Sequence, residues 1–401
     1  MPKNKKPVRR QPPPPAPDRT DELVEDMAVL ALEVAEQEES DPVAIAAKQD
    51  ELQKMVRNAL RKKQDEVLYG AIEHARFDDV DAYVLLRNQI EEAAASIVLR
   101  AEGKPADEID AFLVPVFVNS TGGLRRAEAF QDAAGFELLR ASFQEAGLES
   151  ASATVVLISH LYDVDEIDRI SYSELNEMLR EVAATMGEKK MTAMPALSGS
   201  ISSTGETGAA PDEEVTELRF LLGFVRRRLD DPAYQIPEDE AGMNAWFDAR
   251  MDKYRQWTLV ADALLRAGVA ADPSRISLNF LFQNQFFAAK RQAMAEGNML
   301  SLMADIGAVL AEHSLDPEQA AAVVGPAALD ADVALRVAIY RNGDAAPLQS
   351  ADLPFDLGED LAAGIDELCE ILHSMGLAPV STTARFNADG QAGAVEAWIP
   401  D

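Results

Sequence analysis

The sequence predicts an α/β protein in which an N-terminal helical region is followed by two similar α/β halves with mostly parallel strands. Three observations predict this class. Helical spacing of apolar residues fills the first quarter, buried-strand runs alternate with helices after residue 105, and a Ser/Gly/Thr-rich stretch interrupts that alternation. We expect five segments: a disordered basic, proline-rich tail at 1–20, a helical region at 21–104, a first half at 105–190, a flexible linker at 191–213 and a second half at 214–401.

The helical region is predicted from start signals and apolar spacing. Thr20 offers an N-cap before the acidic pair Asp21-Glu22, which the helix dipole favours in a first turn. Pro42 lies where a second helix would begin, a position at which its missing N–H costs nothing. Further helices are expected over 64–76 and 79–101.

The first half is predicted to be a βαβ unit with parallel strands. Residues 111–118 form a continuous apolar run, typical of a strand covered on both faces, although Pro115 indicates an edge or a bulge. A helix at 124–146, a strand at 154–159 and a helix from Ser171 to about 186 follow, the last with Glu174 completing a capping box.

The second half shows the same alternation. Strands are expected at 218–225, 276–282, 333–340 and 394–399, and helices at 241–267, 284–313 and 357–375. Glycine ends a predicted helix three times, at Gly147, Gly268 and Gly376. This recurrence fits either an internal duplication or the common use of glycine at helix ends, and the sequence leaves both open.

Composition narrows the classes of function. With 37 Lys+Arg against 69 Asp+Glu, the net charge is −32, so nucleic-acid binding by the folded body is not expected. The single cysteine excludes an intramolecular disulfide framework and a multi-thiolate metal site. No apolar run approaches the roughly 18 residues of a membrane span, and no secretory signal is visible, so we expect a cytoplasmic protein without a membrane partner.

The N-terminal tail differs in charge from the rest of the chain. Residues 1–20 hold six basic residues and one acidic residue, a local charge of 6 − 1 = +5, and Pro12 to Pro15 are consecutive. Consecutive prolines favour a polyproline II conformation and prevent a helix. The tail is either a docking arm for an acidic partner, an RNA or a domain that reads proline-rich segments, or it is a solvated chain end without a partner.

Two loops that follow predicted strands carry the candidate site residues. The first is a glycine-bearing turn into a predicted helix, where free N–H groups and two guanidinium groups could hold an anion. It lacks the lysine and spacing of a Walker loop, and an ordinary turn is the alternative. The anion-binding candidates are Ser120, Thr121, Gly122, Gly123, Arg125 and Arg126.

The second loop is acidic. Four carboxylates within six residues could hold a hard cation such as Mg²⁺, with His160 at the strand end as a base. Acidic residues also gather in first turns to satisfy the helix dipole, and the spacing is not that of an EF-hand. The metal candidates are Asp163, Asp165, Glu166, Asp168 and His160.

Three other sets of residues are interpreted as structural and not as functional sites. Cys369 and His373 share one helix face, where the thiol is expected to be a small core residue. Arg226-Arg227-Arg228 is expected to pair locally with Asp230, Asp231 and Glu238. An aromatic group is expected to be core rather than a ligand pocket, and consists of Phe280, Phe282, Phe286 and Phe287.

The segment Leu161-Tyr162-Asp163-Val164-Asp165-Glu166-Ile167-Asp168 with Ser171-Tyr172-Ser173-Glu174 resembles an uncharacterised proteobacterial family, known as a conserved domain of unknown function. Asp81-Ala82-Tyr83-Val84-Leu85 upstream is also similar, so the likeness covers residues 60–190. The resemblance implies a bacterial cytoplasmic α/β protein. It implies no activity, so it assigns no catalytic residue.

These observations favour a non-catalytic protein-interaction or regulatory protein, because no chemical motif accompanies the oppositely charged tail and the polar linker. On this reading no cofactor is required. The alternative is an enzyme or sensor that binds a phosphorylated small molecule with Mg²⁺ at loops 119–126 and 160–168. A homo-oligomer is also open, since apolar helix faces at 21–60 could pair between chains.

Overall fold

The computed structural model describes residues 19–36, 42–100, 102–103, 105–122, 125–126, 133–186, 193–194, 205–206, 214–269, 273–282, 284–329 and 332–399. The chain forms two compact units, Met1–Ala93 and Ala94–Asp401. The tail at 1–20, apart from Arg19 and Thr20, and most of the linker at 191–213 lie outside the described residues.

The first unit is helical, as expected. It contains α1 (Arg19–Ala35), α2 (Pro42–Arg61), α3 (Asp65–Asp78) and most of α4 (Val80–Ala95). Leu52, Leu68 and Leu86 come from three different helices and are fully buried, so α2, α3 and α4 each contribute to a buried interior. The predicted helix at 79–101 is wrong at its end, because Ser96–Leu99 is strand β1 and pairs with the next strand. Its β-branched Ile97-Val98 pair suits a strand better than a helix.

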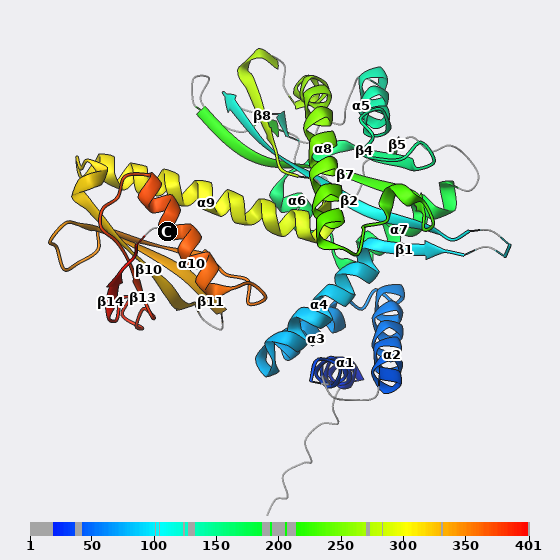
Figure 1. Ribbon diagram of the computed structural model, residues 1–401, viewed down its shortest axis with the longest axis horizontal. Helices are drawn as coiled ribbons and strands as arrows, with labels where there is room; N and C mark the ends of the chain where they lie inside the picture. The colour runs from blue at the N-terminus through cyan, green and yellow to red at the C-terminus, as the bar shows by residue number, and fades with distance from the viewer. Residues whose placement is uncertain are drawn as a thin grey trace, which may run out of the picture. The chain divides into compact units, whose positions relative to one another are not determined.

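The second unit begins with a seven-stranded sheet of order β1-β2-β7-β4-β5, with β8 and β9 also paired to β2. Helices α5 and α8 pack on one face, and α7 and the start of α9 on the other. Figure 1 shows α8 lying across β7 and β2. The strands are β2 (Asp107–Thr121), β4 (Thr154–Tyr162), β5 (Ala193–Met194), β7 (Glu214–Arg228), β8 (Ile276–Phe280) and β9 (Asn284–Gln285); the helices are α5 (Ala133–Glu145), α6 (Val164–Asp168), α7 (Tyr172–Met186), α8 (Glu240–Val269) and α9 (Phe286–Glu312).

The expectation of two similar halves with mostly parallel strands is wrong. Strands β2 and β7, one from each expected half, pair antiparallel along their whole length, from Asp107 opposite Arg228 to Thr121 opposite Glu214. The pairing of β4 with β7 is also antiparallel. A continuous apolar run indicates that both faces of a strand are buried, but it does not indicate the direction of the neighbouring strand. Here helices cover both faces of a mainly antiparallel sheet, so its strands are as apolar as those of a parallel sheet.

A second, five-stranded sheet has the order β12-β11-β10-β13-β14, and α10 and the end of α9 pack on it (Figure 1). Only the β10–β13 pairing in this sheet is parallel. The elements are β10 (Ala320–Leu329), β11 (Asp332–Arg341), β12 (Gln349–Pro354), α10 (Leu361–Ser374), β13 (Val380–Thr383) and β14 (Val395–Ala397). The small strands β3 (Arg125–Arg126) and β6 (Gly205–Glu206) pair separately.

Local signals in the sequence were mostly right. Ser171 and Glu174 form the expected reciprocal bonds before α7, and Gly147 and Gly376 follow helices with positive φ. Gly268 lies inside α8 instead of after it. Pro115 lies where β2 passes from its β8 partner to its β9 partner, which is the kind of interruption a missing N–H requires.

Candidate functional site

The acidic loop after β4 brings two of its predicted residues together. His160 is fully buried, and its Nε2 lies 2.9 Å from Oε2 of Glu166, which is 3% exposed. The same carboxylate accepts the backbone N–H of Asp163, and the Asp163 side chain accepts the N–H of Glu166, so the two residues cap α6 reciprocally. The register of β4 against β7 shifts between Leu157 and Leu161, which places His160 in a bulge.

Tyr162 completes this buried cluster. Its ring meets the His160 ring edge-on, with centroids 4.7 Å apart. Burial, and then the Glu166 charge, raises the pKa of Tyr162 above its ordinary value. Nδ1 of His160, the hydroxyl oxygen of Tyr162 and Oε1 of Glu166 are buried without a hydrogen-bond partner among the described residues.

The four carboxylates of this loop do not converge. Asp165 is exposed, and Asp168 pairs with Lys290 at 2.7 Å instead of facing Glu166. Asp163 and Glu166 are engaged in the cap of α6. Within the described ranges, no group of three or more His, Cys, Asp or Glu residues could hold a metal ion.

The anion-binding candidates are arranged differently from the expectation. The predicted helix at 124–146 begins instead at Ala133, so no described helix starts beside Gly122. The hydroxyl of buried Ser120 donates to the carbonyl oxygen of Gly122, and Thr121 ends β2. Arg125 and Arg126 form strand β3, and Gly123 lies outside the described residues.

The two candidate loops leave the sheet at different levels. Because β2 and β4 are both antiparallel to β7, they run in the same direction, as the sequence predicted for their exits. Tyr162 lies opposite Phe220, whereas Thr121 lies opposite Glu214, six positions closer to the start of β7. Six strand residues span about 20 Å, so the sheet does not support one pocket formed by both loops.

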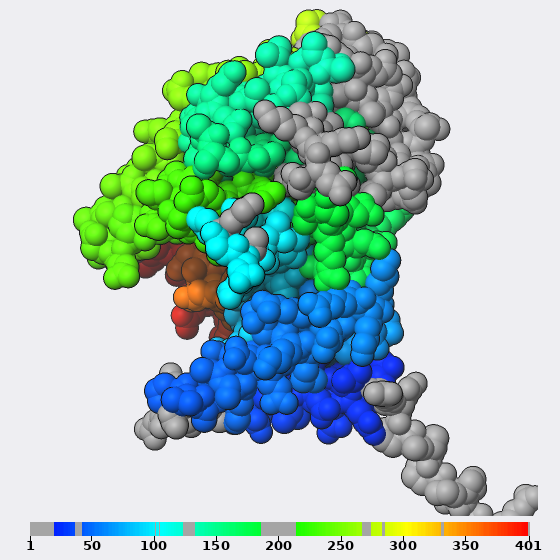
Figure 2. Space-filling model, turned by 90° about the vertical axis from the view of Figure 1, so that its right-hand side faces the viewer, coloured from blue at the N-terminus to red at the C-terminus, as the bar shows by residue number. Residues whose placement is uncertain are grey.

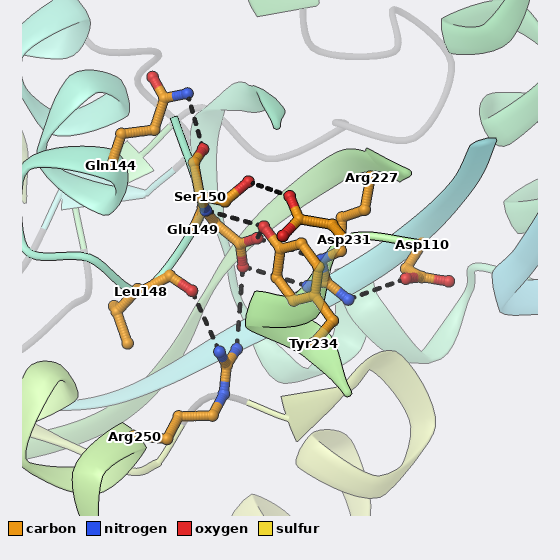
Figure 3. A network of polar contacts seen from close by, with 9 residues as sticks. All are labelled: Asp110, Gln144, Leu148, Glu149, Ser150, Arg227, Asp231, Tyr234 and Arg250. Carbon is orange, nitrogen blue, oxygen red and sulfur yellow. Dashed lines mark hydrogen bonds and ion pairs between the residues drawn. The ribbon is translucent and has the colours of Figure 1, made fainter. Parts of the chain in front are cut away.

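A larger polar network surrounds Glu149, which follows α5 and is 2% exposed. Figure 3 shows Arg227 and Arg250 reaching its carboxylate from β7 and α8. Arg227 donates to both carboxylate oxygens at 3.1 Å, and Arg250 lies 3.8 Å from Oε1. Tyr234 donates its hydroxyl to Oε2 at 2.8 Å. Four segments of the chain therefore meet at one buried carboxylate.

The network continues on both sides of Glu149. Arg227 also donates to Asp110 at 3.0 Å, and its guanidinium lies 4.6 Å from the centroid of the Tyr234 ring. The backbone N–H of Ser150 donates to the Tyr234 hydroxyl oxygen, and its side chain donates to Asp231 (Figure 3). A buried charged group is stable in a fold only if it has a partner, and each charged group in this network has one.

The sequence did not predict this network. The three arginines at the end of β7 were expected to pair locally, and Arg228 with Asp230 does so. Arg226 instead binds Asp107, and Arg227 binds Asp110 and Glu149. The signal in the sequence was the pair of acidic residues Asp107 and Asp110 near the start of β2. In the antiparallel register, which the sequence does not show, Asp107 lies opposite Arg228 and Asp110 lies opposite Val225, beside the three arginines.

Arg250 links the network to an apolar surface on α8. One stripe of α8 packs into the sheet core through residues at helical spacing, namely Tyr254, Trp257, Ala261 and Leu265. The stripe continues towards the start of the helix through Met243, Trp246 and Phe247, which we call the α8 tip surface. There Met243 is 37% and Phe247 46% exposed, whereas Trp257 is fully buried.

Trp246, in the α8 tip surface, contacts both Phe247 and Arg250. Its ring meets the Phe247 ring edge-on at 5.1 Å, and the Arg250 guanidinium lies 5.7 Å from its centroid. Arg250 itself donates to the Leu148 carbonyl oxygen at 3.0 Å (Figure 3). In Figure 2 the lime-green residues that follow β7 and begin α8 project at the left of the view.

The remaining candidates belong to the cores. Cys369 is fully buried, as expected, and burial raises the pKa of its thiol to about 12. Phe280 and Phe282 pack on the α8 side of the first sheet, whereas Phe286 and Phe287 pack on the α7 side. The four rings are therefore core residues, and they lie on two faces instead of forming one patch. In the described part of the chain, no helix has the length and apolar character needed to cross a membrane.

The comparisons with known proteins identify a family. Residues 20–345 match the family described as "Protein of unknown function (DUF2863)", a wider range than the 60–190 that the resemblance covered. No curated protein and no solved structure matches the chain significantly. Since the match covers more than half of the 401 residues, the chain belongs to the DUF2863 family of proteins of unknown function.

Proposed function

We propose that this protein is a non-catalytic protein-interaction protein and that the α8 tip surface is its binding site. The observation that carries the proposal is the apolar stripe of α8, which continues beyond the core that it packs against. Near Trp257 the stripe is covered by the sheet, and at Met243 and Phe247 no described residue covers it to the same degree. A continuous apolar stripe that loses its cover marks an interaction site in a soluble protein.

The composition and rigidity of this surface support the proposal. Tryptophan is enriched among the residues that dominate binding energy, and aromatic residues with methionine are enriched in interfaces. Arg250 ties the first turns of α8 to the Glu149 network, so the aromatic residues are presented on a fixed support. A surface that is already ordered loses less conformational entropy when a partner binds.

The experiment compares two serine substitutions on α8. Full-length protein, Phe247→Ser and Leu259→Ser are immobilised separately, and proteins retained from a lysate of the source cells are quantified by mass spectrometry. Leu259 is the matched control, because it is 73% exposed on a different face of the same helix. We expect proteins that are retained by the wild type and by Leu259→Ser but lost with Phe247→Ser.

Equal retention by all three proteins would contradict the α8 tip surface as the binding site. Far-ultraviolet circular dichroism and the urea midpoint establish that Phe247→Ser is folded, which is expected because its side chain lies at the surface.

The basic tail is a second proposed contact, in keeping with its charge of opposite sign to the body. A chain that lacks residues 1–20, analysed in the same retention experiment, tests it. If the shortened chain loses proteins that Phe247→Ser still retains, the tail has a separate role in binding. If the shortened chain retains the same proteins as the wild type, the proposed contact of the tail is contradicted.

A further inference from the structure

We infer that the α8 tip surface binds an amphipathic helix with basic flanks, contributed by a different protein. This inference rests on the proposed function and adds the chemistry of the partner. The charges around Met243, Trp246 and Phe247 indicate that chemistry.

The border of the α8 tip surface is acidic. Between residues 237 and 255 the sequence has five acidic and three basic residues; of the basic residues, Arg250 lies beside Glu149 and Arg255 pairs with Asp252. Four exposed acidic side chains lie around the start of α8, namely Glu238, Asp239, Glu240 and Asp248, whereas Asp252 lies on another face of the helix and pairs with Arg255. Within the part of the chain that the structure describes, Glu238, Glu240 and Asp248 have no ion pair.

This charge pattern selects among the possible occupants. In a symmetric dimer the same patch meets itself, so two copies would place their acidic borders against each other. An anionic membrane or a nucleic acid would also be repelled, because both are bound by basic surfaces. A partner with basic residues beside an apolar face would instead bury that face on the α8 tip surface, and its basic residues would be attracted to the acidic border.

The geometry favours a helix as that partner. Met243, Trp246 and Phe247 are spaced by three and four residues, so they form one narrow ridge about one turn long with acidic residues near it. A partner helix with apolar residues at i, i+3, i+4 and i+7 can pack along such a ridge, as helices do in grooves and bundles. Basic residues next to that apolar face would lie against Glu240 and Asp248.

The test uses two synthetic amphipathic peptides of about 18 residues, or about five helical turns, with the same leucine face. One has lysine at its polar positions and the other has glutamate. Binding to the full-length protein is measured by fluorescence anisotropy of the labelled peptides. We expect the lysine peptide to bind and the glutamate peptide to bind at least about tenfold more weakly.

Two double variants separate local from general attraction, which matters in a protein of net charge −32. Glu240→Gln with Asp248→Asn removes two charges beside the α8 tip surface. Glu22→Gln with Asp26→Asn removes two exposed charges from α1. We expect only the first pair to weaken the lysine peptide, by about tenfold, and Phe247→Ser to weaken it by at least as much.

Each remaining outcome has a definite meaning. Equal weakening by the two double variants would overturn the inference, because the attraction would then be general. Equal binding of the two peptides, lost with Phe247→Ser, would overturn the basic partner but leave the proposed function standing. A dimer in sedimentation analysis that Phe247→Ser dissociates would make a second copy the occupant. If Phe247→Ser changes neither peptide binding nor retention from lysate, the proposed function itself fails.

Discussion

Glu149 shows how one buried carboxylate can organise a surface. It accepts hydrogen bonds from Arg227 and Tyr234, and it lies beside Arg250. Each of these partners comes from an element that reaches it from a different direction (Figure 3). Arg250 in turn lies 5.7 Å from the centroid of the Trp246 ring, so the network is in contact with the α8 tip surface.

Asp110 is the weaker partner in this network. Burial raises the pKa of Asp110 to about 6, although Arg227 opposes that shift. The pKa of Arg227 is itself raised, chiefly through Glu149, despite its own burial. These two pKa shifts agree with the hydrogen bonds of Arg227. Arg227 donates two hydrogen bonds to Glu149 and one to Asp110, so Glu149 is its main partner.

Stability should therefore depend on pH through Asp110. Between pH ~4 and ~6 the folded protein keeps a proton on Asp110 that the unfolded chain has lost. The free energy of unfolding should accordingly fall as the pH rises through this window, by on the order of 2 kcal/mol. Asp110→Asn, which cannot titrate, should show a flatter dependence in urea unfolding at a series of pH values. The same slope in both proteins, with Asp252→Asn as the exposed control, would contradict this assignment.

At the scale of elements, the first sheet depends on close contact between β2 and β7. Phe112 lies directly opposite Gly223 in the register. A Cβ added to Gly223 would lie 2.3 Å from the Phe112 ring, much closer than carbon atoms can approach. The absence of a side chain at Gly223 therefore makes room for the ring of its partner residue.

Gly223→Ala should destabilise the protein by about 1–3 kcal/mol, because the Phe112 ring must move within a packed core. Gly307→Ala is the matched control. It lies inside α9 with no atom within 4 Å of the new Cβ, so it should stabilise the helix by up to about 1 kcal/mol. Urea midpoints at constant m-value give both changes. If the two substitutions have the same sign, the contact between Phe112 and Gly223 is not what requires glycine there.

Elements differed in how well the sequence predicted them. Helix α10 and the start of α7 followed directly from apolar spacing and from Ser171 and Glu174, because helix bonds and caps join residues four or fewer apart. Strand β10 was missed, since its alanine-rich run Ala320-Ala321-Ala322 has little β-propensity. It is a strand because it pairs with both β11 and β13.

At the scale of the second unit, α9 joins two cores. Its first half contributes Phe286, Ala289 and Ala293 to the core of the seven-stranded sheet. Its second half contributes Leu302, Ile306 and Leu310 to the core of the five-stranded sheet. One continuous helix of 27 residues thus carries both packing surfaces.

Breaking α9 should uncouple the two cores. Glu296 is exposed near the middle of the helix, and Glu296→Pro removes a backbone hydrogen bond and clashes with the preceding turn, at a cost of about 3 kcal/mol. We expect calorimetry to show two separate transitions in Glu296→Pro and one in Glu296→Ala. A single transition in both variants, or two in the wild type, would mean that α9 does not transmit cooperativity between the sheets.

The sequence by itself determined the helical first unit, the capping box before α7, the core position of Cys369 and the approximate bounds of strands β2, β4, β7 and β11. These features depend on residues that are neighbours along the chain, or on how apolar a single segment is. Tertiary structure decided the antiparallel partners of β2, the network around Glu149 and the uncovered part of the α8 stripe. These features depend mainly on contacts between segments about 80 to 170 residues apart, such as Arg227 with Asp110 and β2 with β8. Apolar patterning indicates that a face is buried, but it does not indicate which segment buries it.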